Sequence, residues 1–171
     1  LISTDNEVYL PLGFKAPLSA FNAVTGDTIR TYAESDGVEE VILNNGVLFM
    51  VANKGASELD AYTPVNGRVG DQAMVRQLFW DEEPRVLMAY DAKSGQQLWA
   101  KRSKVTPLTM SADKDKIYFH DGEQLLALNQ QTGDVAWQSE PVGRRRQVTF
   151  NFGPRLVIHE DVVLFAGGEG E

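Results

Sequence analysis

A seven-residue pattern occurs three times in the chain, and it constrains the fold more than any other feature. The pattern is Ala, an apolar residue, Asp or Asn, two variable residues, Thr or Ser, and Gly. Its fixed positions are Ala20, Asn22, Gly26, Ala89, Asp91, Gly95, Ala127, Asn129 and Gly133. Asp or Asn side chains accept backbone hydrogen bonds within turns, and Gly supplies the positive φ that closes a tight loop. Each copy therefore predicts a β-hairpin.

Tryptophan follows the glycine by four residues in two of the copies. These residues are Trp99 and Trp137, whereas the first copy has Arg30 at that position. A Trp near the end of the next strand offers a large apolar face and an N–H that needs an acceptor. We therefore interpret both tryptophans as structural. We expect both to be buried between neighbouring sheets, with each indole N–H bonded to backbone.

The spacing of the copies predicts an array of similar sheets. Gly95 and Gly133 are 38 residues apart, close to the length of a four-stranded propeller blade, which is about 40–45 residues. The first interval is longer and predicts an insertion at 53–85. Apolar runs between turn signals place strands at 7–12, 18–22, 28–32, 38–43, 47–52, 86–91, 96–101, 108–112, 116–120, 124–129, 134–139, 155–159 and 162–166.

The predicted fold is all-β. It is a β-propeller of four-stranded antiparallel blades, present as a partial, open arc of about four blades because a closed ring needs more than this chain supplies. The expected units are 1–32 (a blade lacking its inner strand), 38–101 (a blade with the insertion), 107–139 (a complete blade) and 154–171 (the start of a fourth).

The repeat resembles the tryptophan-docking motif of quinoprotein dehydrogenases, Ala-x-Asp-x-x-Thr-Gly-x-x-x-Trp. The second copy matches it except for Ser94 in place of Thr. The resemblance places the chain in the pyrroloquinoline-quinone-like (PQQ-like) repeat superfamily and implies a propeller of seven or eight blades. That superfamily contains quinone- and calcium-dependent dehydrogenases and also cofactor-free scaffold proteins. The resemblance also implies a bacterial protein located in the periplasm or elsewhere outside the cytoplasm.

The chain departs from the dehydrogenases in one visible respect. Quinoprotein alcohol dehydrogenases often carry a disulfide of adjacent cysteines over the quinone, and this chain has no cysteine. Their calcium ligands and catalytic Asp have no local signature that can be transferred to a residue here. No catalytic residue and no metal ligand are therefore assigned from the sequence.

Composition argues against several other classes of function. Sixteen Lys and Arg against 24 Asp and Glu give a net charge of −8, which disfavours nucleic-acid binding through bulk charge. No apolar run approaches the length of about 20 residues that spans a bilayer. The chain begins without Met and stops just after an apolar strand pattern, so we expect both ends to be cut and any targeting segment to be lost.

Isolated polar residues give weaker signals. His120 and His159 lie beside predicted turns, where a polar role at a strand end is commoner than catalysis. The run 81–83 is acidic and could bind a hard cation, although such a run is more often a solvated loop.

Chain direction sorts the loops of such a propeller onto two faces. The connections between blades and the loops between second and third strands share one face, which we expect to gather positive charge and to bind ligands. The ligand-binding candidates there are Arg144, Arg145, Arg146, Arg76 and Trp80. At least one of the three consecutive arginines should pair with a carboxylate of 81–83 or with a bound anion, because an unpaired buried guanidinium is costly.

Two functions remain open at this stage. The first is a non-catalytic propeller that acts as a binding or scaffolding module, without a cofactor. Its partners would be the remaining blades or another chain, together with an anionic ligand or a protein. The alternative is part of an alcohol or sugar dehydrogenase that depends on PQQ and calcium. Nucleic acid is not expected as a partner in either case.

Overall fold

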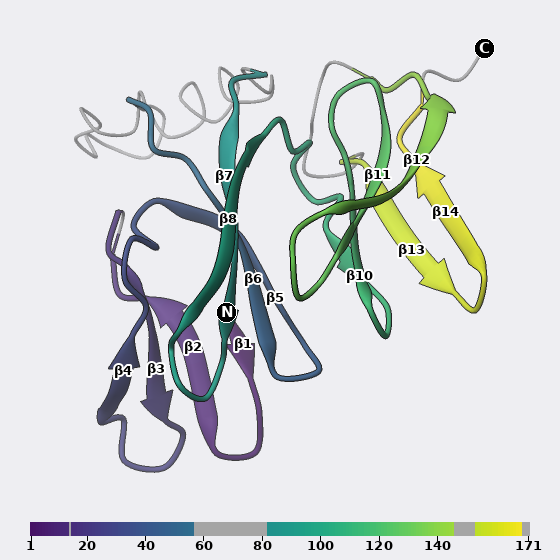
Figure 1. Ribbon diagram of the computed structural model, residues 1–171. Helices are drawn as coiled ribbons and strands as arrows, with labels where there is room; N and C mark the ends of the chain where they lie inside the picture. Colours follow the sequence, from purple (N-terminus) through teal and green to yellow (C-terminus); the bar gives the residue numbers. More distant parts are fainter. Residues whose placement is uncertain (14, 57–81, 146–152, 169–171) are drawn as a thin grey trace.

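The computed structural model describes residues 1–13, 15–56, 82–145 and 153–168. All regular elements within these ranges are β-strands (Figure 1). They are β1 (Ile2–Ser3), β2 (Glu7–Pro11), β3 (Leu18–Asn22), β4 (Thr28–Thr31), β5 (Val38–Asn44), β6 (Val47–Ala52), β7 (Arg85–Asp91), β8 (Gln97–Ser103), β9 (Ser111–Ala112), β10 (Lys116–His120), β11 (Gln124–Asn129), β12 (Val135–Pro141), β13 (Arg155–His159) and β14 (Val162–Ala166).

The strands form four antiparallel sheets that follow one another along the chain. Sheet 1 has the order β1-β2-β3-β4, sheet 2 has β5-β6-β7-β8, sheet 3 has β9-β10-β11-β12, and sheet 4 consists of β13 and β14. Strand β1 contacts β5, and β9 contacts β13, so the first strands lie together on the inner side of the arc. In the described residues no sheet closes on itself, and the fold is a partial propeller arc, as the sequence predicted.

Three apolar cores hold consecutive sheets together. Strand β6 contributes side chains to two of these cores, because its alternate side chains point to opposite faces of the sheet. Leu48 and Met50 pack toward sheet 1, whereas Phe49 and Val51 pack toward sheet 3. All six residues of β6 are buried. A third core between sheets 3 and 4 contains Leu156. Strand β6 is therefore apolar on both faces.

The turns gather on two opposite faces of the arc. Turns that join the first strand to the second, and the third to the fourth, share one side, which we call the hairpin face. Ala92 N donates to Gly46 O at 2.8 Å and Gln130 N to Asp115 O at 2.9 Å, and each bond joins two such turns. The loops between second and third strands and the connections between sheets lie at the opposite ends of the strands. We call this side of the arc the loop face. Figure 1 shows the hairpins β5–β6, β7–β8 and β13–β14 turning toward its lower side.

The first strands of sheets 1 and 3 differ from the prediction by more than a shift of their ends. Sheet 1 does have an inner strand, because Ile2 and Ser3 pair with Tyr9 and Val8. Strand β9 is shorter than the predicted 108–112. Leu108 has a φ of 64°, and its backbone N–H donates to a side chain of sheet 2 instead of to β10. The ladder of sheet 3 therefore begins only at Ser111.

Candidate functional site

The three copies of the repeat build the same turn on the hairpin face. Asn22 Oδ1 accepts the backbone N–H groups of Val24 and Thr25 at 2.9 and 3.0 Å. Asp91 and Asn129 accept equivalent bonds in their own copies. The closing glycines all have φ between 73° and 76°, and the three template alanines are fully buried. The template residues are therefore placed as parts of the framework.

In the first two copies, the fourth residue after the glycine reaches toward the hairpin of the next sheet. Trp99 Nε1 donates to Gln130 O at 2.7 Å. Arg30 Nη1 makes the corresponding bond to Ala92 O at 3.0 Å. Both acceptors directly follow the Asp or Asn of the template. Arg30 thus makes the same side-chain-to-backbone bond between sheets 1 and 2 that Trp99 makes between sheets 2 and 3.

The expectation for Trp137 is wrong. Its side chain is 43% exposed instead of buried between sheets. In the described residues sheet 4 has only β13 and β14, so no hairpin equivalent to 130–133 covers this indole. The sequence repeat predicted the position of Trp137 correctly relative to its own sheet, but its burial depends on the next one.

The loop face carries two of the arginines singled out in the sequence, Arg144 and Arg145. Arg144 Nη2 lies 2.6 Å from Glu82 Oε1, and the Arg144 side chain is only 5% exposed. The expected pairing with a carboxylate of 81–83 is therefore confirmed. Arg145 is exposed, and its backbone N–H donates to Gly167 O at 2.9 Å. The other candidates, Arg76, Trp80 and Arg146, lie outside the described residues.

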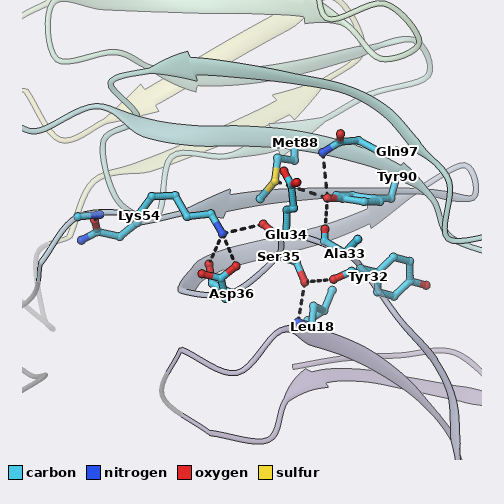
Figure 2. A network of polar contacts seen from close by, with 12 residues as sticks. Leu18, Tyr32, Ala33, Glu34, Ser35, Asp36, Lys54, Met88, Tyr90 and Gln97 are labelled. Atoms are coloured by element: carbon cyan, nitrogen blue, oxygen red, sulfur yellow. Dashed lines mark hydrogen bonds and ion pairs between the residues drawn. The ribbon is translucent and has the colours of Figure 1, made fainter.

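The connection between sheets 1 and 2 is tied to the segment that follows β6 (Figure 2). The Lys54 ammonium donates to Glu34 O at 2.7 Å, to Asp36 O at 2.9 Å and to Asp36 Oδ1 at 2.6 Å. This ammonium lowers the pKa of Asp36. Ser35 Oγ accepts the Leu18 N–H at 2.8 Å within the same network. Lys54 is therefore used to fix a loop.

A cavity of about 610 Å³ opens beside this network, between sheets 1 and 2. Pro11, Leu12 and Val38 line it together with the charged side chain of Glu39. Glu39 Oε2 also accepts a bond from Arg85 Nε at 2.8 Å. The loop face thus has a hollow of the size that ligand sites usually have, about 300–1,000 Å³.

Glu40 joins sheet 2 to sheet 3 close to this face. Its two carboxylate oxygens accept the backbone N–H groups of Leu108 at 3.0 Å and Met110 at 3.2 Å. Burial raises the pKa of Glu40 to about 7, although the two amides oppose the shift. The sequence analysis did not single out Glu40, because its partners lie about 70 positions away and carry no side-chain signal.

His120 is fully buried at the end of β10. Its Nε2 lies 2.8 Å from Val142 O, and its Nδ1 accepts the Gly122 N–H at 2.9 Å. The ring stacks on Phe165 at 4.7 Å between centroids. The polar role at a strand end predicted from the sequence is the one that the structure shows.

Metal ligands do not converge in the part of the chain that the structure describes. No group of three His, Asp or Glu side chains there could hold a metal ion. The same ranges contain no helix long and apolar enough to cross a membrane.

The sheets, their junctions and the repeated hairpin together define a partial β-propeller of PQQ-like repeats. A family model described as outer membrane protein assembly factor BamB matches residues 3–171, and the chain belongs to this family.

A solved structure supports the same fold. The crystal structure of BamB from Moraxella catarrhalis matches with a TM-score of 0.57 and 13% identity. The match covers 95% of this chain and 44% of that one, so the chain spans less than half of that protein. A search of curated proteins gave no match.

Proposed function

We propose that the chain is part of a non-catalytic PQQ-like repeat propeller, whose loop face binds a protein partner as a scaffold. The observation that supports the proposal is that the polar side chains near this face bond to neighbouring segments of the chain. Glu40 bonds to the connection that enters sheet 3, His120 to the connection that leaves it, and Arg144 to Glu82. Side chains that an enzyme would use for proton transfer or ligand binding here hold neighbouring segments together.

The family description gives this proposal its direction. Its members are described as an outer membrane protein assembly factor, which indicates work on other proteins. The proposed partner is therefore a polypeptide destined for the outer membrane or a protein that handles it. A rigid arc with exposed loops suits this role, because binding residues are commonly carried on loops positioned by a rigid scaffold. The proposal includes no cofactor and places the protein outside the cytoplasm.

Binding to an outer-membrane β-barrel polypeptide tests the proposal directly. We expect saturable binding of a fluorescently labelled barrel protein freshly diluted from urea, followed by anisotropy. Arg145→Glu reverses an exposed charge on the loop face and should weaken binding several-fold. Lys93→Glu is the matched control, since Lys93 is exposed on the hairpin face, and it should leave binding unchanged.

Two outcomes would contradict the proposal. One is a failure of the barrel polypeptide to bind, or an equal effect of the two charge reversals. The other is a bound-quinone absorption spectrum after addition of PQQ and calcium, accompanied by dye-linked oxidation of an alcohol. That second result would support the dehydrogenase alternative.

A further inference from the structure

The junction between sheets 3 and 4 is built around one buried histidine. His120 is 0% exposed and touches three separate segments. Its ring bonds to Val142 in the connection that leaves sheet 3, stacks on Phe165 of β14, and receives a bond from the turn at Gly122. A change at this ring therefore acts on the junction as a whole.

The hydrogen bonds fix the protonation state of the ring without ambiguity. The Gly122 backbone N–H can only donate, so Nδ1 must be the unprotonated acceptor. The Val142 carbonyl can only accept, so Nε2 must carry the hydrogen. Thr106 Oγ1 lies 3.4 Å from Nδ1 and can donate to it as well. The geometry thus requires the neutral Nε2–H tautomer.

A second proton would have to be placed on Nδ1, opposite the Gly122 N–H. That contact would change from a hydrogen bond to a repulsion between two donors. Two charged groups act on the ring: Asp121 on the same turn favours the charged form, and Arg144 on the connection disfavours it. Thr106, Thr109 and Phe165, which complete the contacts from neighbouring segments, carry no charge.

We propose that His120 is a proton-sensitive latch, which holds the 121–123 turn in place when neutral and releases it when protonated. The charged ring keeps its Nε2–H bond to Val142 O, whereas the released turn withdraws Glu123 O, which accepts the Val142 N–H. The proposal does not depend on the identity of a binding partner, because it concerns only contacts within this chain.

The direction of the pH effect follows from linkage. Burial lowers the pKa of His120 below its usual value of 6.5. The closed junction therefore binds the proton less tightly than an open one, and stability is lost as the pH falls below about 6.5. Glu40 titrates in an overlapping range with the opposite sign, so the stability of the whole chain is a poor readout. A local measurement at the 121–123 turn is needed.

Amide exchange provides that local measurement. The Gly122 N–H bonds to His120 Nδ1 at 2.9 Å and the Val142 N–H to Glu123 O at 2.8 Å, so both should be protected at about pH 7.5. After correction for intrinsic rates, we expect their protection to fall by up to about tenfold per pH unit between about pH 6.5 and the lower pKa of His120 in the closed junction. The amides of β10 and β11 should keep their protection over the same range.

Two variants separate the latch from other titrations. His120→Gln removes the titrating ring and should abolish the pH dependence, even if the protection at neutral pH is lower. His159→Gln removes the other of the two histidines, which is exposed, and should leave the dependence intact. An unchanged pH dependence in His120→Gln would overturn the proposal, as would constant protection in the wild-type chain down to about pH 5.

Nitrogen NMR of the wild-type ring keeps the proposal testable if His120→Gln does not fold. The ring should show the Nε2–H tautomer at neutral pH, and its titration midpoint should lie at the lower end of the pH range over which Val142 protection falls. A ring that titrates without any change at Val142, or a neutral ring with Nδ1 protonated, would contradict the latch.

Discussion

At the scale of single residues, the side chain four positions after each template glycine decides how tightly neighbouring sheets are joined. Trp99 at this position is half-buried, contacts Phe49 at 6.1 Å between ring centroids and donates to Gln130 O. Trp137 occupies the same position in sheet 3 and is exposed. The two tryptophans are therefore expected to contribute differently to the free energy of unfolding.

Alanine substitution should separate the two tryptophans. Trp99→Ala removes a packed ring and a hydrogen bond, and should destabilise the chain by about 3 kcal/mol. Trp137→Ala removes a ring that is 43% exposed and has no hairpin of a following sheet over it in the described residues, and should cost less, about 0.5–1 kcal/mol. Urea unfolding of both variants measures the difference. Equal losses would show that Trp137 is also buried in solution.

Glycine-to-alanine changes test the same junction from the opposite side. A Cβ on Gly133 would lie 2.7 Å from Trp99 Cδ2, whereas a Cβ on Gly26 would meet nothing within 4 Å. Both glycines have nearly the same positive φ, so backbone strain of about 1–2 kcal/mol is common to both variants. Gly133→Ala should lose at least about 1 kcal/mol more than Gly26→Ala. Unfolding midpoints and the near-ultraviolet circular dichroism of Trp99 would measure the excess, and identical losses would contradict the contact.

At the scale of strands, local patterns predicted the elements whose partners come from their own sheet. Strands β3, β6, β10, β11, β13 and β14 have the predicted bounds, because apolar runs and turn residues mark them directly. Strand β9 does not, because Glu40 of the preceding sheet takes the amides of Leu108 and Met110. A contact between residues so far apart leaves no trace in the local pattern.

The same distinction applies to the candidate site. The pairing of Arg144 with the 81–83 segment was predictable, because chain direction placed both on one face and charge required a partner. The bonds of His120 to Val142 and Gly122 were not predictable, because backbone groups supply both partners. Backbone partners carry no side-chain signature in a sequence.

Glu40 should give the junction between sheets 2 and 3 a measurable pH dependence. Its pKa is about 7 in the folded chain and 4.5 as the ordinary value, so the folded state binds the extra proton between these limits. Stability contributed by this group therefore falls as pH rises through that window, by at most about 1.4 kcal/mol per unit. Subtracting the Glu40→Gln stability from that of the wild type at each pH should isolate this slope.

Glu7 provides a control of opposite sign. The Tyr9 hydroxyl, which donates to Glu7 at 2.6 Å, lowers the pKa of Glu7. Its contribution is therefore present above about pH 4.5 and is lost as pH falls through the lower folded value. Subtracting the Glu7→Gln stability should give a difference that shrinks with acidification. A flat difference for Glu40 would show that its carboxylate is not desolvated in solution.

At the scale of the whole molecule, the arc ends on a strand with the composition of an interior one. Strand β14 is apolar at every position, Val-Val-Leu-Phe-Ala, like β6, which is buried on both faces. One face of sheet 4 packs on sheet 3 through Phe165. On the other face Val157, Val162 and Leu164 are 54–61% exposed.

An apolar face of this kind should make the 171-residue chain self-associate or bind apolar dyes. We expect sedimentation velocity to show mass increasing with concentration, and anilinonaphthalene sulfonate to fluoresce on binding. Leu164→Lys should reduce both signals without unfolding the chain, because its side chain points away from sheet 3. Val24→Lys is the control, since Val24 is 91% exposed on an isolated hairpin tip and its replacement should change neither signal. A monomeric chain that binds no dye would contradict the exposure of this face.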